Sequence, residues 1–245
     1  MRAWYLKLSA EDATEDVVLV GDRSRALRAA DLLDGAVVAN EDRGLTTVIG
    51  GWKGLPVTVS AFGMGGPIAA IVLHELAALG SRRFLRAGTM MVRGIPTGTF
   101  IVVESALVHE GTSSAYGVDG PLVDLDRRIV DAALSVAPAS LTRSGTVASC
   151  DGFYTQMTDL LGTRVKAVDL DALWDRHQVI GIDMETSVLA NVARTLGVEF
   201  GSVCLGTVDS DGPTLMEQEN RDEMEQTLLE IAFDTLFTLK EGSSP

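Results

Sequence analysis

The segment FLRAGT, residues 84–89, contains a residue type that strand interiors rarely hold. Arg86 follows two apolar residues of a strand-like run, while Gly88 and Thr89 are typical of the turn that ends a strand. A guanidinium group stays charged in proteins and rarely enters a core without an anion beside it. The segment therefore predicts that Arg86 binds an anion where a buried strand ends.

Other strand-like runs end in similar residues. Their tips are Gly21-Asp22-Arg23, Gly63-Met64-Gly65-Gly66, Cys150-Asp151-Gly152-Phe153 and Thr207 to Asp211. Three of the five tips, counting that of Arg86, place glycine beside a charged or hydroxyl residue, which suits close approach of the backbone to an oxyanion. Because α/β folds bind ligands at the carboxyl ends of their strands, the tips indicate one shared site.

Alternating strands and helices must hold these tips. Strands are expected at residues 17–21, 46–50, 56–63, 83–88, 99–109, 144–150 and 199–211. Helices are expected at residues 23–33, 67–79, from near 119 to 136, 183–197 and 216–239. This order predicts a single α/β domain over residues 1–245, with a mostly parallel mixed sheet covered by helices on both faces. Residues 241–245 are expected to be a frayed tail.

Composition narrows the class of protein. With 245 residues, 46% of them hydrophobic, the chain can bury one large core. No apolar run approaches the roughly 20 residues of a membrane helix, and the N-terminal segment turns acidic where a secretory signal is apolar. Cys150 and Cys204 are too few for a disulfide framework, so a cytoplasmic location is expected.

The charge balance narrows the ligand. The formal charge is −14, from 20 basic and 34 acidic residues. Such a field repels nucleic acids and anionic membranes, so neither is expected as a partner. A small anion can still bind where arginines gather.

Familiar motifs are mostly missing. GMGGPI, residues 63–68, has two glycines of a dinucleotide fingerprint, but Ile68 replaces the third. About 20 positions further on, Arg86 lies near the place where an NAD enzyme has an acidic residue, so an NADP-dependent dehydrogenase is an alternative. The sequence has no P-loop, G-x-S-x-G or H-E-x-x-H motif. Its three histidines are scattered, so neither a metal cluster nor a Ser-His-Asp triad is indicated.

The strand tips together resemble a known family, the nucleoside phosphorylases. The matching segments are GDRSR (21–25), NEDRG (40–44), GMGGP (63–67), FLRAGT (84–89), SCDGFY (149–154), DMET (183–186) and TVD (207–209). They occur in the order seen in the hexameric branch that contains bacterial purine nucleoside phosphorylase and uridine phosphorylase. The resemblance runs from about Tyr5 to the last helix. The resemblance implies the nucleoside phosphorylase fold. It also implies a homo-oligomer built from dimers, expected to be a hexamer.

The resemblance implies that the anion beside Arg86 is inorganic phosphate. Gly21 would offer its backbone N–H, and Arg25 and Arg86 would clamp the phosphate oxygens together with Thr89. Arg43 would come from the neighbouring subunit. Guanidinium groups suit this task because their planar donors match phosphate oxygens. The alternative for Arg25 and Arg43 is ordinary surface charge. Phosphate is the co-substrate, and no metal or organic cofactor is implied.

The resemblance also implies a ribose site. Glu185 would accept hydrogen bonds from the 2′- and 3′-hydroxyls, with Met184 and Met64 packing on the sugar. Tyr5 stands where the family's histidine reaches the 5′-hydroxyl from the neighbouring subunit. Bonds to a 2-hydroxyl strengthen as an oxocarbenium-like transition state forms, so one carboxylate both binds and accelerates. The alternative is that Glu185 only places negative charge at a helix N-terminus.

The base site is the least family-like. Phe153 would stack on the base, with Gly88, Met91 and Gln156 around it. The family has a small residue and glycine after Thr89, whereas this chain has two methionines, which should narrow or reshape the pocket.

Two carboxylates compete for the role of acid. Asp209 matches the aspartate with which purine-specific members protonate the leaving base, a role that needs a raised pKa. Asp211 shares its strand parity and is the competing candidate, and either could be loop charge. Arg23 also departs from the family, which has proline there.

The leading hypothesis is therefore phosphate-dependent cleavage of a purine nucleoside to free base and ribose 1-phosphate. Uridine is the alternative substrate, because FLRAGT and HELAALG are more similar to uridine phosphorylase. A hydrolytic nucleosidase and a non-catalytic nucleoside-binding module are further alternatives.

Overall fold

The computed structural model of the chain describes residues 1–154, 170–210 and 214–242. The strands are β1 (Asp16–Val20), β2 (Asp34–Asn40), β3 (Thr47–Trp52), β4 (Leu55–Ala61), β5 (Arg83–Val92), β6 (Phe100–His109), β7 (Leu122–Asp124), β8 (Thr142–Cys150), β9 (Gly181–Asp183), β10 (Glu199–Asp209) and β11 (Thr214–Leu215). The helices are α1 (Arg23–Leu32), α2 (Gly66–Leu79), α3 (Thr112–Ala115), α4 (Arg127–Val136), α5 (Leu170–His177), α6 (Thr186–Leu196) and α7 (Gln218–Glu241).

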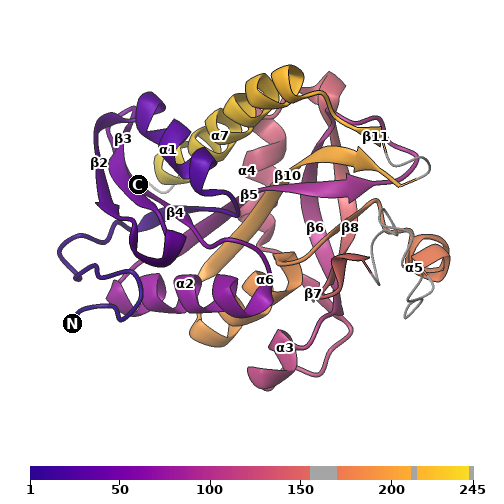
Figure 1. The fold of residues 1–245 in the computed structure, drawn as a ribbon, viewed down its shortest axis with the longest axis horizontal. Helices are drawn as coiled ribbons and strands as arrows, with labels where there is room; N and C mark the ends of the chain where they lie inside the picture. The colour runs from indigo at the N-terminus through magenta and orange to yellow at the C-terminus, as the bar shows by residue number, and fades with distance from the viewer. Residues whose placement is uncertain (155–169, 211–213, 243–245) are drawn as a thin grey trace.

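Five strands close into a ring. β5 pairs with β10, which is followed by β6, β8 and β9, and β9 pairs again with β5. From β5 the sheet also continues as an open wing through β1, β4 and β3 to β2. β5 therefore belongs to both the ring and the wing, and lies at the centre of the molecule (Figure 1).

Helices cover the sheet on two sides. In Figure 1, α2 and α6 lie below the sheet, while α1 and α7 lie above it. β1 is buried along its whole length, as expected for a β-branched strand covered on both faces. The prediction of an α/β fold with a mixed sheet covered by helices is confirmed. No helix among the described residues is long and apolar enough to cross a membrane.

Antiparallel pairing is more prominent than the sequence pattern indicates. Among the described strands, five pairings are parallel and six are antiparallel. The predicted hairpin of β3 and β4 turns at Lys53 and Gly54, which both have positive φ, the geometry of a tight two-residue turn. Such turns join antiparallel neighbours and need no crossover helix.

Two predicted boundaries differ most from the observed ones. β5 does not end at Gly88 but runs on to Val92, because it pairs with β10 along its whole length. The helix expected from near Asp119 begins only at Arg127, where the Asp126 side chain accepts hydrogen bonds from the first turn. The elements β2, β7, β9, β11, α3 and α5 were not predicted, and β7 lies within the segment that was predicted as helix.

Candidate functional site

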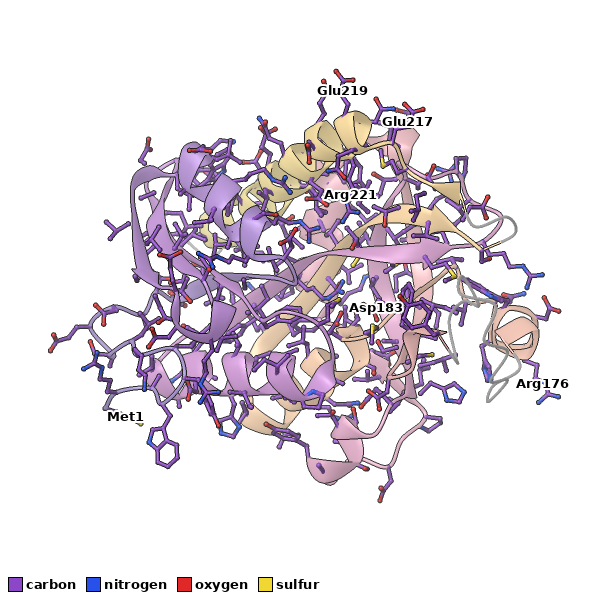
Figure 2. The ribbon with its side chains drawn as sticks, viewed as in Figure 1. Met1, Arg176, Asp183, Glu217, Glu219 and Arg221 are labelled. Carbon is purple, nitrogen blue, oxygen red and sulfur yellow. The ribbon has the colours of Figure 1, made fainter. Side chains whose placement is uncertain are left out.

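A pocket of about 470 Å³ opens at the strand tips that the sequence singles out. Its walls come from the segments after β1, β4 and β8, from β5, β9 and β10, and from the start of α6 and of α7. The lining residues are Gly21, Asp22, Arg23, Arg25, Gly63, Met64, Arg86, Gly88, Thr89, Met90, Met91, Phe153, Ile182, Asp183, Met184, Glu185, Thr207, Val208 and Arg221. Figure 2 shows Asp183 near the centre of the molecule and Arg221 above it on α7.

Arg86 has two carboxylates of the chain beside it. Its Nη2 donates to Oε2 of Glu185 at 2.7 Å, and its Nη1 lies 3.2 Å from Oδ2 of Asp183. Nη1 also donates to the sulfur of Cys204 at 2.6 Å. The side chain is only 3% exposed, and its Nε–H has no hydrogen-bond partner among the described residues. The chain itself thus supplies two anions for Arg86, so an external anion would be a third.

Gly88 explains how the guanidinium fits. Residues 86 and 88 lie on the same face of β5, because side chains alternate along a strand. A Cβ atom on Gly88 would lie 1.8 Å from Nη1 of Arg86, which no real contact allows. Gly88 therefore leaves room for the Arg86 side chain to fold back over β5. The guanidinium group of Arg86 occupies the space beside Gly88.

Glu185 is held from two sides at the N-terminus of α6. Its Oε1 accepts the backbone N–H of Gly65 at 2.7 Å, and its Oε2 accepts from Arg86. Gly65 has a φ of 97°, a conformation that L side chains rarely adopt. Burial raises the pKa of Glu185; Arg86 opposes that shift, and the charge of Asp183 adds to it.

Asp183 is held by hydrogen bonds from β8 and from the start of α6. Its Oδ1 accepts the hydroxyl of Ser149 at 2.6 Å, and its Oδ2 accepts the hydroxyl of Thr186. Backbone N–H groups of the first turn of α6 point at the same carboxylate. Asp183 is 2% exposed, so it links the tips of β8 and β9 and the start of α6 inside the core.

Arg25 is the second buried arginine of the pocket. It is 2% exposed, which excludes the alternative of surface charge. Its Nε and Nη2 donate to the two carboxylate oxygens of Glu225, at 3.2 and 2.8 Å, and its Nη1 donates to the Ala87 carbonyl at 3.1 Å. Arg25 therefore spans α1, α7 and β5 beside Arg86.

The side of the pocket away from Arg25 is apolar. Met91 pairs with Ile182 across β5 and β9, and both belong to a small core that includes Leu107 and Trp174. Phe153, Met184 and Val208 pack against this core and line the pocket. The wall predicted to meet the base therefore consists of thioether, aliphatic and aromatic groups among the described residues.

The structure brings most of the predicted site residues together. Those that line the pocket are Gly21, Arg25, Met64, Arg86, Gly88, Thr89, Met91, Phe153, Met184 and Glu185. Asp209 is the last residue of β10, directly after Val208, and is not among the described residues that line the pocket. Gln156 and Asp211 lie outside the described residues.

Arg43 and Tyr5 lie in a different place. The Arg43 guanidinium carbon is 5.3 Å from the centre of the Tyr5 ring. With Arg2, Trp4 and Lys7 they line a separate surface hollow. Within one chain neither residue reaches the pocket of Arg86.

The family of the chain follows from comparison with known proteins. The model of the phosphorylase superfamily matches residues 15–236, which is most of the chain. The chain belongs to the phosphorylase superfamily. The predicted resemblance to the nucleoside phosphorylases, which are pentosyltransferases, is therefore confirmed.

Individual relatives within the superfamily differ in the base they are named for. A uridine phosphorylase of Thermococcus kodakarensis is 33% identical over 211 residues, covering 82% of this chain and 75% of that protein. A guanosine phosphorylase of Halorubrum lacusprofundi is 28% identical, covering 84% and 83%. A DeoD-type purine nucleoside phosphorylase of Roseobacter denitrificans is 29% identical, covering 93% and 96%.

A solved structure shares the fold of this phosphorylase. The uridine phosphorylase of Vibrio fischeri superposes with a TM-score of 0.84 at 24% identity and covers 97% of each chain. The ring and the wing described above therefore belong to a known architecture.

Sequence reasoning missed two residues on α7. Arg221 lines the pocket and donates to Glu225 at 2.8 Å, yet its segment is highly charged and resembles any solvated helix start. Glu225 offered a usable signal: it shares a helix face with Leu228 and Leu229, which are fully buried. Among the described residues, no group of three or more His, Cys, Asp or Glu side chains could hold a metal ion.

Proposed function

We propose that this phosphorylase cleaves the N-glycosidic bond of uridine with inorganic phosphate, giving uracil and ribose 1-phosphate. One observation carries the proposal: the guanidinium groups of Arg25 and Arg86 line the same pocket as the carboxylate of Glu185. Cations that match a phosphate and an anion that matches sugar hydroxyls thus lie side by side.

The residues divide into a phosphate end and a ribose end. Arg25, Arg86, Thr89 and the backbone N–H of Gly21 bind phosphate, whose oxygen attacks the anomeric carbon as the base departs. Glu185 accepts hydrogen bonds from the ribose hydroxyls and stabilises the positive charge that develops on the sugar. The ion pair of Arg86 with Glu185, at 2.7 Å, joins the two ends, so each ligand orders the binding group of the other.

Uridine takes precedence over the purine nucleosides that Asp209 first suggested. Relatives and solved structures named uridine phosphorylase support this choice. Asp209 does not line the pocket, whereas uracil can leave as a delocalised anion that depends less on a carboxylic acid. Met91 adds bulk where the family has glycine. A purine nucleoside is the second candidate, favoured by the relatives named for guanosine and purines.

Base release from a nucleoside panel, measured with and without phosphate, tests the proposal. Uridine should release uracil only when phosphate is present, and ribose 1-phosphate should appear in equal amount. Release without phosphate would indicate a hydrolytic nucleosidase, and binding without release would indicate a nucleoside-binding module. Faster release from inosine or guanosine than from uridine would favour the purine reading.

The assembly follows from the position of Arg43 and Tyr5. Because neither reaches the pocket of its own chain, we infer that both complete the site of a neighbouring subunit in a dimer-based particle, expected to be a hexamer. The reaction uses nucleoside and phosphate without a metal or organic cofactor. A cytoplasmic setting suits Cys150 and Cys204, which are both free and buried.

A further inference from the structure

Glu225 is a buried carboxylate to which the proposed reaction gives no role. It lies on α7, and its side chain is 1% exposed. Three guanidinium groups surround it: Arg25 binds both of its oxygens, Arg221 donates at 2.8 Å and Arg28 donates from the outer side. Two of these arginines, Arg25 and Arg221, line the pocket. Glu225 therefore connects α7 to the phosphate end of the site.

The contacts of Arg25 fix the direction of its guanidinium group. An arginine has five N–H donors in one plane. Arg25 uses two of them on Glu225 and one on the Ala87 carbonyl, so two N–H donors remain without a partner among the described residues. Ala87 lies in β5 directly between Arg86 and Gly88, so the guanidinium plane is held between α7 and the strand that carries Arg86.

Glu225 does not simply neutralise Arg25. Its single negative charge is shared with Arg28 and Arg221, while Asp222 pairs with Arg28 on the outer side and Asp22 interacts with Arg25 and Arg28. Burial pulls the pKa of Glu225 upward, but the hydrogen bonds and charges of Arg25 and Arg221 outweigh it and hold the pKa below its ordinary value. The carboxylate therefore stays charged and keeps its hold on Arg25.

We propose that Glu225 is a positioning residue that aims the two remaining N–H donors of Arg25 at phosphate. The inference rests on the proposed function and adds to it. Without the carboxylate, a long arginine side chain would have to be ordered by phosphate itself, which weakens binding. Glu225 acts through Arg25 and touches neither substrate.

Steady-state kinetics of two variants tests this role. Glu225→Gln removes the charge, and Glu225→Asp keeps the charge but withdraws the carboxylate by one methylene. Both should raise the KM for phosphate, by about tenfold or more for Glu225→Gln, as expected for one displaced charge-assisted hydrogen bond. The KM for the nucleoside should change less than about twofold in each. The control is Asp222→Asn, which removes an exposed carboxylate of α7 that pairs with Arg28 of α1.

A double variant separates positioning from general loss of stability. In an Arg25→Ala background, adding Glu225→Gln should leave the phosphate KM unchanged, because the residue through which Glu225 acts is already gone. A further rise in that background, an unchanged phosphate KM in both single variants, or a lower one in Glu225→Gln would each overturn the role. If the unaltered protein releases base without any need for phosphate, the proposed function fails instead.

Discussion

Arg86 combines a contribution to stability with the phosphate-binding role proposed for it. It is the cation between two buried carboxylates, Asp183 and Glu185, and it also lines the pocket. Burying a charge without a partner is costly, whereas exchanging a whole buried ion pair for apolar groups can be nearly neutral. Removing Arg86 alone should therefore cost more stability than replacing Arg86 and both carboxylates together by apolar residues.

Arg86→Met should destabilise the fold by about 3–5 kcal/mol, since both carboxylates lose their cation. Burial already raises the pKa of Glu185, and the loss of Arg86 raises it further. The folded variant then binds a proton that the unfolded chain releases, so its stability should fall as the pH rises above the ordinary pKa of a glutamate side chain. Urea unfolding at several pH values measures this.

The control for Arg86 is Arg23→Met, which removes an exposed arginine paired with exposed Glu41. It should cost less than about 1 kcal/mol and show no such pH dependence. Equal stability of the two variants would mean that Asp183 and Glu185 do not depend on Arg86.

Met91 is expected to limit the size of the base. Met91→Ala opens the apolar wall next to Phe153 and should raise kcat/KM for inosine relative to uridine by about tenfold or more. Leu107→Ala is the matched control, because Leu107 belongs to the same small core but does not line the pocket. Both should lower stability, by about 2–5 kcal/mol, but only Met91→Ala should change the ratio. An unchanged ratio would assign base size to another wall.

At the scale of elements, one carboxylate holds the N-terminal segment against α2. Glu75 accepts the backbone N–H groups of Trp4, Tyr5 and Leu6 at 2.9 to 3.1 Å. Leu6 is fully buried, while Trp4 is 81% exposed. The segment is thus fastened through its backbone, and the Tyr5 ring is presented beside Arg43.

Glu75→Gln should loosen this segment, because an amide offers one acceptor oxygen where the carboxylate offers two. The cost should be about 1–3 kcal/mol for the N–H groups left without acceptors. Limited digestion with chymotrypsin should cut after Trp4 or Tyr5 several times faster than in the unaltered protein, while Glu11→Gln, at an exposed position, should not differ from it. Equal cutting of both variants would show that burial of Leu6 alone holds the segment.

Sequence patterns predicted the elements whose apolar residues recur at a clear period. They did not predict boundaries that depend on pairing with distant strands. β1 and α2 were predicted within about a residue of their observed bounds, because apolar spacing and glycine mark them. The end of β5 was misplaced, since Gly88 resembles a turn but serves to admit Arg86. The apolar period alone could not show that pairing with β10 extends β5 to Val92.

The candidate site was predicted as a set of residues but not as a network. Arg25, Arg86 and Glu185 were named from the strand tips and the family resemblance. That Glu185 pairs with Arg86, and Glu225 with Arg25, depends on side chains brought together over 99 and 200 positions of sequence. Such distant pairs leave no mark in local spacing.

At the scale of the whole molecule, the site is expected to be shared between subunits. If Arg43 completes a neighbour's pocket, Arg43→Ala and Glu185→Ala subunits should each be nearly inactive alone. Mixed after subunit exchange, they should recover part of the activity, because some pockets then combine intact Arg43 with intact Glu185. No recovery after exchange has been verified by mass would place Arg43 outside the site.

The closed ring has a consequence for dividing the chain. β5 and β6 come before the exposed connection at residues 117–120, whereas β8, β9 and β10 follow it. A cut there would leave Arg25 and Arg86 on one fragment and Glu185 and Arg221 on the other, with every ladder that closes the ring running between them except β8–β9. Neither fragment would hold the complete pocket, yet the strands of one fragment pair with those of the other along four ladders. The connection is therefore a natural place to build a split reporter, in which phosphorolysis would return only when two fused proteins bring the halves together.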